Sequence, residues 1–108
     1  MPFRQLVLFA VLLGTATPAQ AEPDWQGVLP AYYIVGSAAK YCKNIVLSPD
    51  EKARVLQSIA FAESKSGLGK KEMGDMARDM DETIADNPDI CLTLAKSLHD
   101  SIKGMQTK

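Results

Sequence analysis

The chain has 108 residues, of which 46 % are hydrophobic, 23 % are charged and 6 % are aromatic. This length and balance are typical of one small globular domain, and they exclude a disordered chain, a transmembrane bundle and a nucleotide-binding α/β enzyme of ordinary size. Arg4 lies before residue 21 and every acidic residue lies after it, so the part beyond residue 21 has 11 basic and 13 acidic residues. Because a formal charge of −2 gives no excess positive field for phosphates, the sequence does not favour nucleic acid as a partner.

The first 21 residues have the three parts of an export signal. Arg4 lies in a short start, and an apolar run spans Leu6 to Leu13. Ala19 and Ala21 are the small residues that precede a cleavage point. The apolar run is shorter than the roughly 20 residues of a membrane span. The sequence therefore predicts cleavage after Ala21, no stable membrane anchor, and export to the bacterial periplasm, with secretion into the medium as the alternative.

The predicted export determines the redox environment of the only two cysteines, Cys42 and Cys91. An oxidising compartment permits a disulfide between them, whereas two thiols without a CxxC pattern make a weak metal site and a poor redox centre. The sequence predicts a structural bond between Cys42 and Cys91, and a catalytic or sensing thiol is the alternative. The bond would close a loop of 49 residues, which chain-entropy arithmetic values at roughly 4 kcal/mol.

A short arm and a first helix are predicted to follow the signal. Residues 22–30 contain two prolines and a glycine, which favours an arm, with Trp25 packing on the body of the single helical domain predicted over residues 31–108. The first helix is predicted to run from Ala31 to about Leu47. Its apolar residues recur at steps of three and four: Ile34, Val35, Ala38, Tyr41, Cys42 and Ile45. A glycine at position 36 costs a helix up to about 1 kcal/mol relative to alanine, so we expect close packing there.

The second helix has the clearest start signal in the chain. Ser48 offers a capping hydroxyl, Pro49 takes the first helical position, and Glu51 lies three residues after the serine. The helix is predicted to run to about Ser66, because Gly67 favours a left-handed stop. Its predicted buried face comprises Val55, Leu56, Ile59, Ala60 and Ala62.

A third helix is predicted over Lys70 to Asp86, and a fourth opens at Asn87 and Pro88 and ends at Gly104. The apolar positions of the third are Met73, Met76, Ala77, Met80 and Ile84. Those of the fourth are Cys91, Leu94, Ala95, Leu98 and Ile102. No segment alternates as a strand does. The predicted fold class is therefore all-α, a small bundle of about four short helices with one disulfide.

Two rows of side chains on the third helix suggest metal binding. Met73, Met76 and Met80 offer thioethers, which suit Cu(I), and the alternative is that they fill the core. The acidic row lacks a calcium-binding loop, and its alternative is a solvated face: Glu72, Asp75, Asp79, Asp81, Glu82, Asp86 and Asp89. The sequence predicts no cofactor and assigns no metal ligand, and it leaves copper binding through the methionines as an alternative function.

Catalytic and binding side chains are few. His99 is the only histidine, and no nucleophile motif or phosphate-binding glycine loop accompanies it, so we expect no enzyme and interpret His99 as a boundary residue. Tyr32 and Tyr33 form either a binding face with Trp25 or the edge of the core. The first half of the domain has a small excess of positive charge from Lys40, Lys43, Lys52 and Arg54. These side chains either steer a partner toward the domain or form ion pairs with the acidic third helix.

In layout, the chain is similar to the small acid-stress chaperones of the enteric periplasm. The likeness lies in Cys42, Cys91 and the helical pattern between them, since those chaperones are also short, signal-bearing and helical, with two cysteines at a comparable interval. Together these features predict a small exported, non-enzymatic binding or accessory protein, with a stress-response or virulence role and a protein partner. The oligomeric state is open, and the alternatives are an acid-stress periplasmic chaperone and a periplasmic copper-binding protein.

Overall fold

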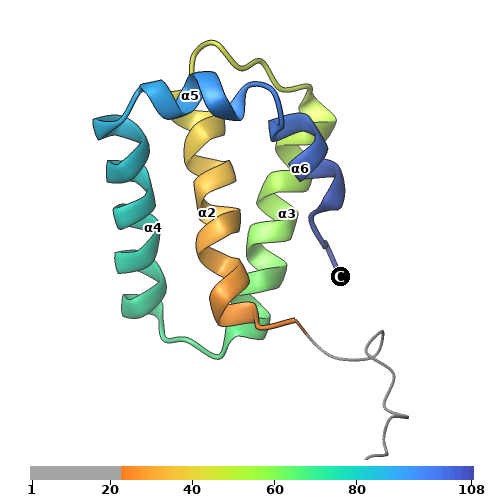
Figure 1. Ribbon diagram of the computed structural model, residues 1–108. Helices are drawn as coiled ribbons and strands as arrows, with labels where there is room; N and C mark the ends of the chain where they lie inside the picture. Colours follow the sequence, from red (N-terminus) through yellow and green to blue (C-terminus); the bar gives the residue numbers. More distant parts are fainter. Residues whose placement is uncertain (1–22) are drawn as a thin grey trace, which may run out of the picture.

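The computed structural model describes residues 23–108, in which three long helices stand side by side and two short helices follow (Figure 1). The helices are α2 (Trp25–Tyr41), α3 (Pro49–Ser66), α4 (Lys70–Asp86), α5 (Asp89–Leu94) and α6 (Leu98–Gly104). The described part of the chain contains no strand, which confirms the all-α class. Residues 1–21 and the predicted cleavage after Ala21 lie outside the described residues.

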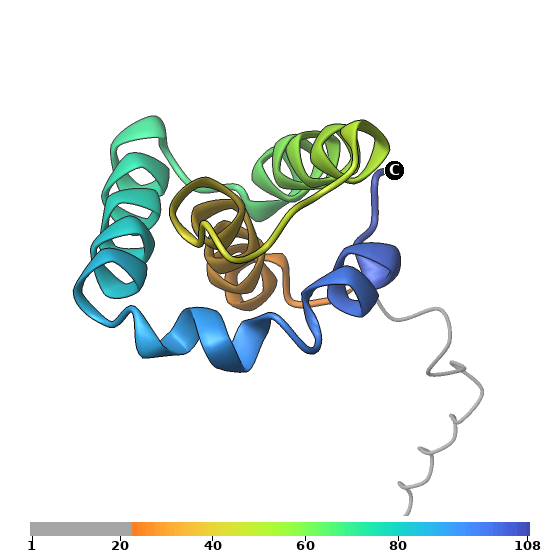
Figure 2. The same ribbon diagram turned by 90° about the horizontal axis from the view of Figure 1, so that it is seen from above.

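Helix α2 is the central element of the fold. α3 and α4 each pack along it, and they have little contact with each other. Seen from above, α5 and α6 lie on one side of α2, whereas no described helix covers the opposite side, between α3 and α4 (Figure 2). The fold therefore leaves one long side of its central helix open.

Helix α2 begins at Trp25, so the prediction of an arm over residues 22–30 is wrong for most of that segment. The carboxylate of Asp24 accepts a hydrogen bond from the amide of Gly27 (3.3 Å) and caps the helix. Pro30 lies inside the helix, where a proline costs roughly 3 kcal/mol. Trp25 and Leu29, one helical turn apart, are almost completely buried, and the apolar surface that they remove from water offsets the loss at Pro30.

Helix α2 ends at Tyr41, well before the predicted end near Leu47. The amide of Cys42 still bonds to the carbonyl oxygen of Ala38 (2.9 Å), but the chain then leaves the helix. Ile45 and Leu47 remain buried in the non-helical segment that follows. Their apolar spacing therefore arises because the connecting segment is itself buried, and it does not mark one face of a helix.

The predicted bounds of the second and third helices are confirmed. Ser48 and Glu51 form the capping box: the Ser48 hydroxyl accepts from the Glu51 amide (3.1 Å), and the Glu51 carboxylate accepts from the Ser48 amide (2.9 Å). Gly67 has a φ of 73°, the left-handed stop expected of it. Leu56 and Ala60, predicted to be buried, are instead exposed.

The predicted fourth helix is two helices, because α5 ends at Leu94 and α6 begins at Leu98. Asn87 does not cap α5; its side-chain amide donates to the carbonyl oxygen of Thr83 (2.8 Å) at the end of α4. The break places Cys91 over the end of α2 and buries Leu98 in the same core from a different direction. Figure 1 shows that α5 and α6 run in different directions.

Buried side chains form two clusters, one on each half of α2. The first surrounds the cysteine pair and joins α2 to α5 and α6 through Val35, Ala38, Cys42, Cys91, Leu98 and Ile102. The second lies at the start of α2, around Trp25, Leu29, Tyr33 and Ala62, with the methionines of α4 packed against it. The ring of Trp25 contacts that of Phe61 edge to face at 5.2 Å. Packing of Trp25 on the body is therefore confirmed.

Ser58 gives a test of this core. Its side chain is fully buried on α3, and its hydroxyl has no hydrogen-bond partner among the described residues. A buried, unsatisfied hydroxyl is destabilising by about 1–3 kcal/mol, because it is hydrated in the unfolded chain. We expect Ser58→Ala to raise the free energy of unfolding by about 1 kcal/mol in urea denaturation. Ser101→Ala, at an exposed position, should leave it unchanged, and a loss of stability in Ser58→Ala would contradict the prediction.

Candidate binding groove

An open groove runs along the uncovered side of α2, between α3 and α4. Two adjoining hollows form it, with volumes of about 200 Å³ and 270 Å³. Both are lined by Gly36 and Lys40 of α2 and by Leu56 of α3, so they lie next to each other. Ile59 of α3 and Ala77 of α4 line the part that reaches across α2. The lining is therefore mainly apolar.

The floor of the groove follows from the periodicity of α2. Val35 and Ala38 face the core around the cysteine pair, so Gly36 and Lys40 lie on the other side of the helix. A Cβ atom on Gly36 would lie only 2.9 Å from Cδ1 of Ile59. The missing side chain thus allows α3 to approach α2 closely, which confirms the close packing expected at this glycine. It also means that no side chain rises from the floor of the groove at this position.

Leu56 forms an exposed apolar wall of the groove. Helix α3 buries Val55, Ser58 and Ala62, and Leu56 lies beside this buried face with 70 % of its surface exposed. Full burial of a leucine side chain is worth about 1.5–3 kcal/mol. Most of that free energy is available to a molecule that covers Leu56.

Charged side chains gather at the end of the groove nearer the carboxyl end of α2. Asp81 of α4 accepts a hydrogen bond from the Ser37 hydroxyl and pairs with Lys40 at 3.3 Å. The pair joins α2 to α4, as expected if the positive first half pairs with the acidic helix. Lys52, at the groove edge on α3, forms no ion pair with any described residue. This end of the groove therefore has a net positive charge.

At the other end, Tyr33 is nearly buried and its hydroxyl donates to the Glu63 carboxylate at 2.5 Å. Burial and this contact with Glu63 raise the pKa of the Tyr33 phenol well above its ordinary value. The phenol therefore stays protonated as a donor, and the contact fixes α2 against α3. Tyr32 is partly buried, and its oxygen accepts a hydrogen bond from the Gln106 amide (2.9 Å). Both tyrosines thus contribute to the fold rather than to a face with Trp25.

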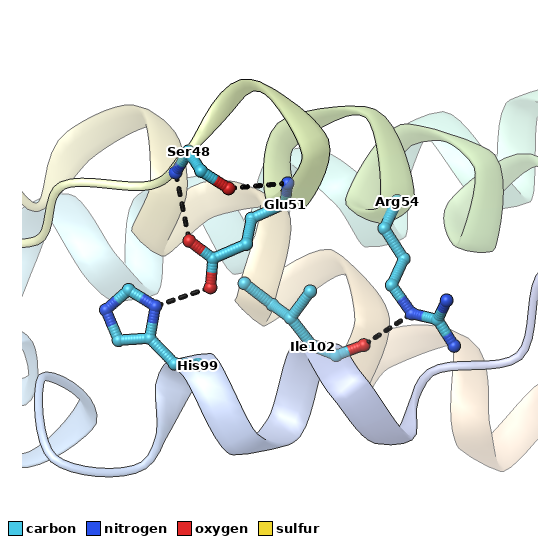
Figure 3. Close-up of polar contacts among 5 residues, drawn as sticks. All are labelled: Ser48, Glu51, Arg54, His99 and Ile102. Atoms are coloured by element: carbon cyan, nitrogen blue, oxygen red, sulfur yellow. Dashed lines mark hydrogen bonds and ion pairs between the residues drawn. The ribbon is translucent and has the colours of Figure 1, made fainter.

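A second polar cluster, outside the groove, holds α6 against α3 (Figure 3). The guanidinium of Arg54 donates to three main-chain carbonyl oxygens: those of Ile102 (2.9 Å), Lys103 (3.2 Å) and Met105 (2.8 Å). The last carbonyls of a helix lack partners within the helix. Arg54, on α3, donates to two carbonyl oxygens at this end and to that of Met105, which follows α6. The sequence analysis did not assign this structural role to Arg54.

Arg54→Ala should lower the free energy of unfolding by roughly 1.5–3 kcal/mol, the range for a hydrogen bond to a charged group. Hydrogen exchange should accelerate in α6 before it does so in α4. Arg54→Lys should restore only part of the loss, because an ammonium lacks the planar fork of donors. Arg78→Ala is the matched control, since Arg78 forms an exposed ion pair with Asp75 on α4. An equal effect of the two alanine variants would contradict the assigned role of Arg54.

His99 contacts the Glu51 carboxylate in the same cluster (Figure 3). The hydrogen bond from His99 and that from the Ser48 amide lower the pKa of Glu51 below its ordinary value. The Ser48 hydroxyl, however, accepts from the Glu51 amide and makes no contact with the imidazole. The three residues therefore do not form a nucleophile, base and orienting acid. The side chain of His99 is about half exposed, which agrees with the interpretation of His99 as a residue at the boundary between core and surface.

The structure places the predicted cysteine pair together. The sulfur atoms of Cys42 and Cys91 lie 2.05 Å apart, at disulfide distance, and their Cα atoms are 5.4 Å apart. Cys42 follows the last residue of α2, and Cys91 lies on α5. The side chain of Asn44 donates to the Cys91 carbonyl oxygen (3.3 Å) and supports this junction.

The methionine candidates are used in packing, and two of the acidic candidates, Asp75 and Asp81, form ion pairs. Met73, Met76 and Met80 pack against the second core cluster. Asp75 pairs with Lys71 and Arg78. Within residues 23–108 no group of three or more His, Cys, Asp and Glu side chains is placed to hold a metal ion. A Cu(I) titration of the native chain and of a Met76→Leu, Met80→Leu variant tests the methionine row separately.

Comparison with protein-family models, with curated proteins and with solved structures finds no match to this chain. Among the described residues, no helix has both the length and the apolar character to cross a membrane. The groove was not foreseen from the sequence, because Leu56 fits the apolar spacing of a buried face. The one available signal was Gly36, which marked where α2 and α3 meet closely.

Proposed function

We propose that this chain is an exported, non-enzymatic binding protein of the bacterial periplasm, an accessory or stress-related factor that acts on a protein partner. The groove is the single observation that supports binding. It combines the exposed Leu56, a floor without a side chain at Gly36 and a positively charged end at Lys52. Exposed apolar surface bordered by polar groups is typical of interaction sites. The proposal of export rests on the sequence pattern of the first 21 residues.

The proposal is tested in the source bacterium with the full chain. A photoreactive amino acid replaces either Leu56, in the groove, or Leu92, which is 67 % exposed on α5 and serves as the matched control. We expect one discrete protein adduct at position 56, none at position 92, and a periplasmic chain that begins at Glu22. A chain that retains residues 1–21 in the cytoplasm contradicts the export part, and equal crosslinking at both positions contradicts the binding part.

A second candidate function, binding of unfolding proteins in acid, is favoured by the position of the carboxylates. Asp81 joins α4 to α2, Glu63 joins α3 to α2, and Glu51 joins α3 to α6. Ordinary carboxylates are protonated at pH 2–3, which removes or weakens each of these contacts. The cysteine bond is insensitive to acid, so the helices would separate while α2 stays tied to α5.

Aggregation measurements test the acid-stress function. A client protein that aggregates at both pH 2.5 and pH 7 is mixed with the mature chain, and light scattering is followed. We expect suppression at pH 2.5 and none at pH 7, because the opened helices expose the apolar faces that are buried in the folded domain. Absence of suppression at an equimolar ratio in acid would exclude this function and leave the first proposal intact.

A further inference from the structure

We infer that the groove receives an amphipathic helix of a partner protein, with its apolar side on Gly36 and Leu56 and its carboxylates toward Lys52. This inference rests on the proposed binding function and specifies the chemistry of the partner. It follows from the shape of the groove, from its charge, and from the side of α2 that the fold leaves uncovered.

The shape of the groove fits a helix. In the hollow that Ala77 lines, the floor is α2 and the walls are α3 and α4, which have little contact with each other. The hollow beside Lys52 is lined by α2 and α3. A helix laid between α3 and α4 packs on α2 at the usual distance of about 8–10 Å between axes. Recognition of this kind uses apolar anchors at i, i+3, i+4 and i+7 of the bound helix. Leu56, exposed by 70 %, is the residue on the groove side that such anchors would bury.

The charge of the groove selects the sign of the partner. The charge of Lys40 is balanced by its ion pair with Asp81. Lys52, in contrast, has no ion-pair partner among the described residues. A net positive end is a local exception in a domain whose formal charge beyond residue 21 is −2. Carboxylates on the bound helix would complement it.

The same charges argue against a second copy of this chain as the occupant. A two-fold dimer through this face would place the same patch of both copies together. Where the two-fold axis passes beside Lys40 and Lys52, these lysines of one copy would lie near their own counterparts, and like charges in such a contact are unfavourable. A heterologous acidic helix avoids this repulsion.

Two synthetic peptides of 18 residues test the inference with the ¹⁵N-labelled mature chain. Both carry leucines at helical i, i+4, i+7 and i+11 positions, and they differ only in having glutamates or lysines on the flanks. We expect the acidic peptide to bind more tightly at low salt and to shift the backbone amide signals of Gly36, Lys40 and Leu56. Added salt should narrow the difference between the peptides, because it screens exposed charges.

Matched variants of the chain make the test specific. Leu56→Asp should lower the affinity for the acidic peptide by at least about tenfold, because the variant loses the burial of one leucine side chain. Lys52→Glu should lower this affinity about two- to fivefold, which is the range for the loss of an exposed ion pair. Leu92→Asp and Lys96→Glu change exposed residues away from the groove and should leave the affinity unchanged. The amide spectrum of each variant verifies that it is folded.

The outcomes separate this inference from the proposed function. Equal affinity for both peptides, or signal shifts centred on α5 in place of the groove, overturns the inference. If a discrete adduct still forms at position 56 in the bacterium, the binding function stands and only the partner chemistry is wrong. If there is neither an adduct nor peptide binding, both are wrong.

Discussion

Removal of the Cys42–Cys91 bond will lower the free energy of unfolding by roughly 4 kcal/mol, from the entropy of the loop that the bond closes in the unfolded chain. The two residues are separated by 49 positions, and a small domain has a total stability of only about 5–10 kcal/mol. We therefore expect a Cys42→Ala, Cys91→Ala variant to be largely unfolded at temperatures where the native chain is folded. Urea denaturation followed by circular dichroism measures the difference.

The location of the bond predicts which part opens first. Helix α5 has six residues and no side-chain cap, so it depends on the junction with α2 for its position. Hydrogen exchange should therefore rise in α5 and α6 before it rises in α3. Reductant should destabilise the native chain and have no effect on the double variant. An unchanged melting temperature after complete reduction would show that the bond does not stabilise the fold.

Lowering the pH from 7 to 2.5 is expected to unfold the tertiary structure, with most of the loss below pH 4.5. The contact with His99 lowers the pKa of Glu51 in the folded chain below its ordinary value of 4.5, and Lys71 and Arg78 lower that of Asp75 below 3.8. The folded state therefore binds fewer protons than the unfolded state. This stability is complete above the ordinary pKa values and is lost as the pH falls through the lowered ones.

The change in net charge is the larger cause of acid unfolding. Beyond residue 21 the chain has nine lysines, two arginines and one histidine. If the chain is cleaved after Ala21 as proposed, its charge with protonated carboxylates and a free amino terminus approaches +13, and self-repulsion at that charge favours expanded states. Urea denaturation at pH 7, 4 and 2.5 measures the stability. Glu51→Gln should reduce the stability at pH 7 and make its pH dependence shallower, and an unchanged slope would contradict the role of Glu51.

Local signals explain how far the fold is predictable from the sequence. Helix α3 has the predicted bounds because adjacent residues set its ends: the capping box at Ser48 and the left-handed Gly67. The start of α4 is also set locally, since the Gly69 amide donates to the Glu72 carboxylate. The start of α2 was missed because Pro30 is a local argument against helix, whereas the burial of Trp25 and Leu29 that outweighs it is tertiary.

Tertiary packing also explains the other differences. The break between α5 and α6 falls at Ala95, Lys96 and Ser97, a segment without glycine or proline, so no local signal marks it. It is set by the need to reach both Cys42 and the core beside α3. The groove depends likewise on how α3 and α4 are placed along α2, and the exposure of Leu56 could not be read from its spacing.

The cysteine bond has a topological consequence. It joins the residue after α2 to α5, so the whole of α3, the connection at residues 67–69 and the whole of α4 belong to one covalent ring. A protease that cuts once at Gly67 or Gly69 would leave both pieces in a single molecule, and the cut would appear only after reduction. Damage to this connection therefore need not release a helix or separate the walls of the groove.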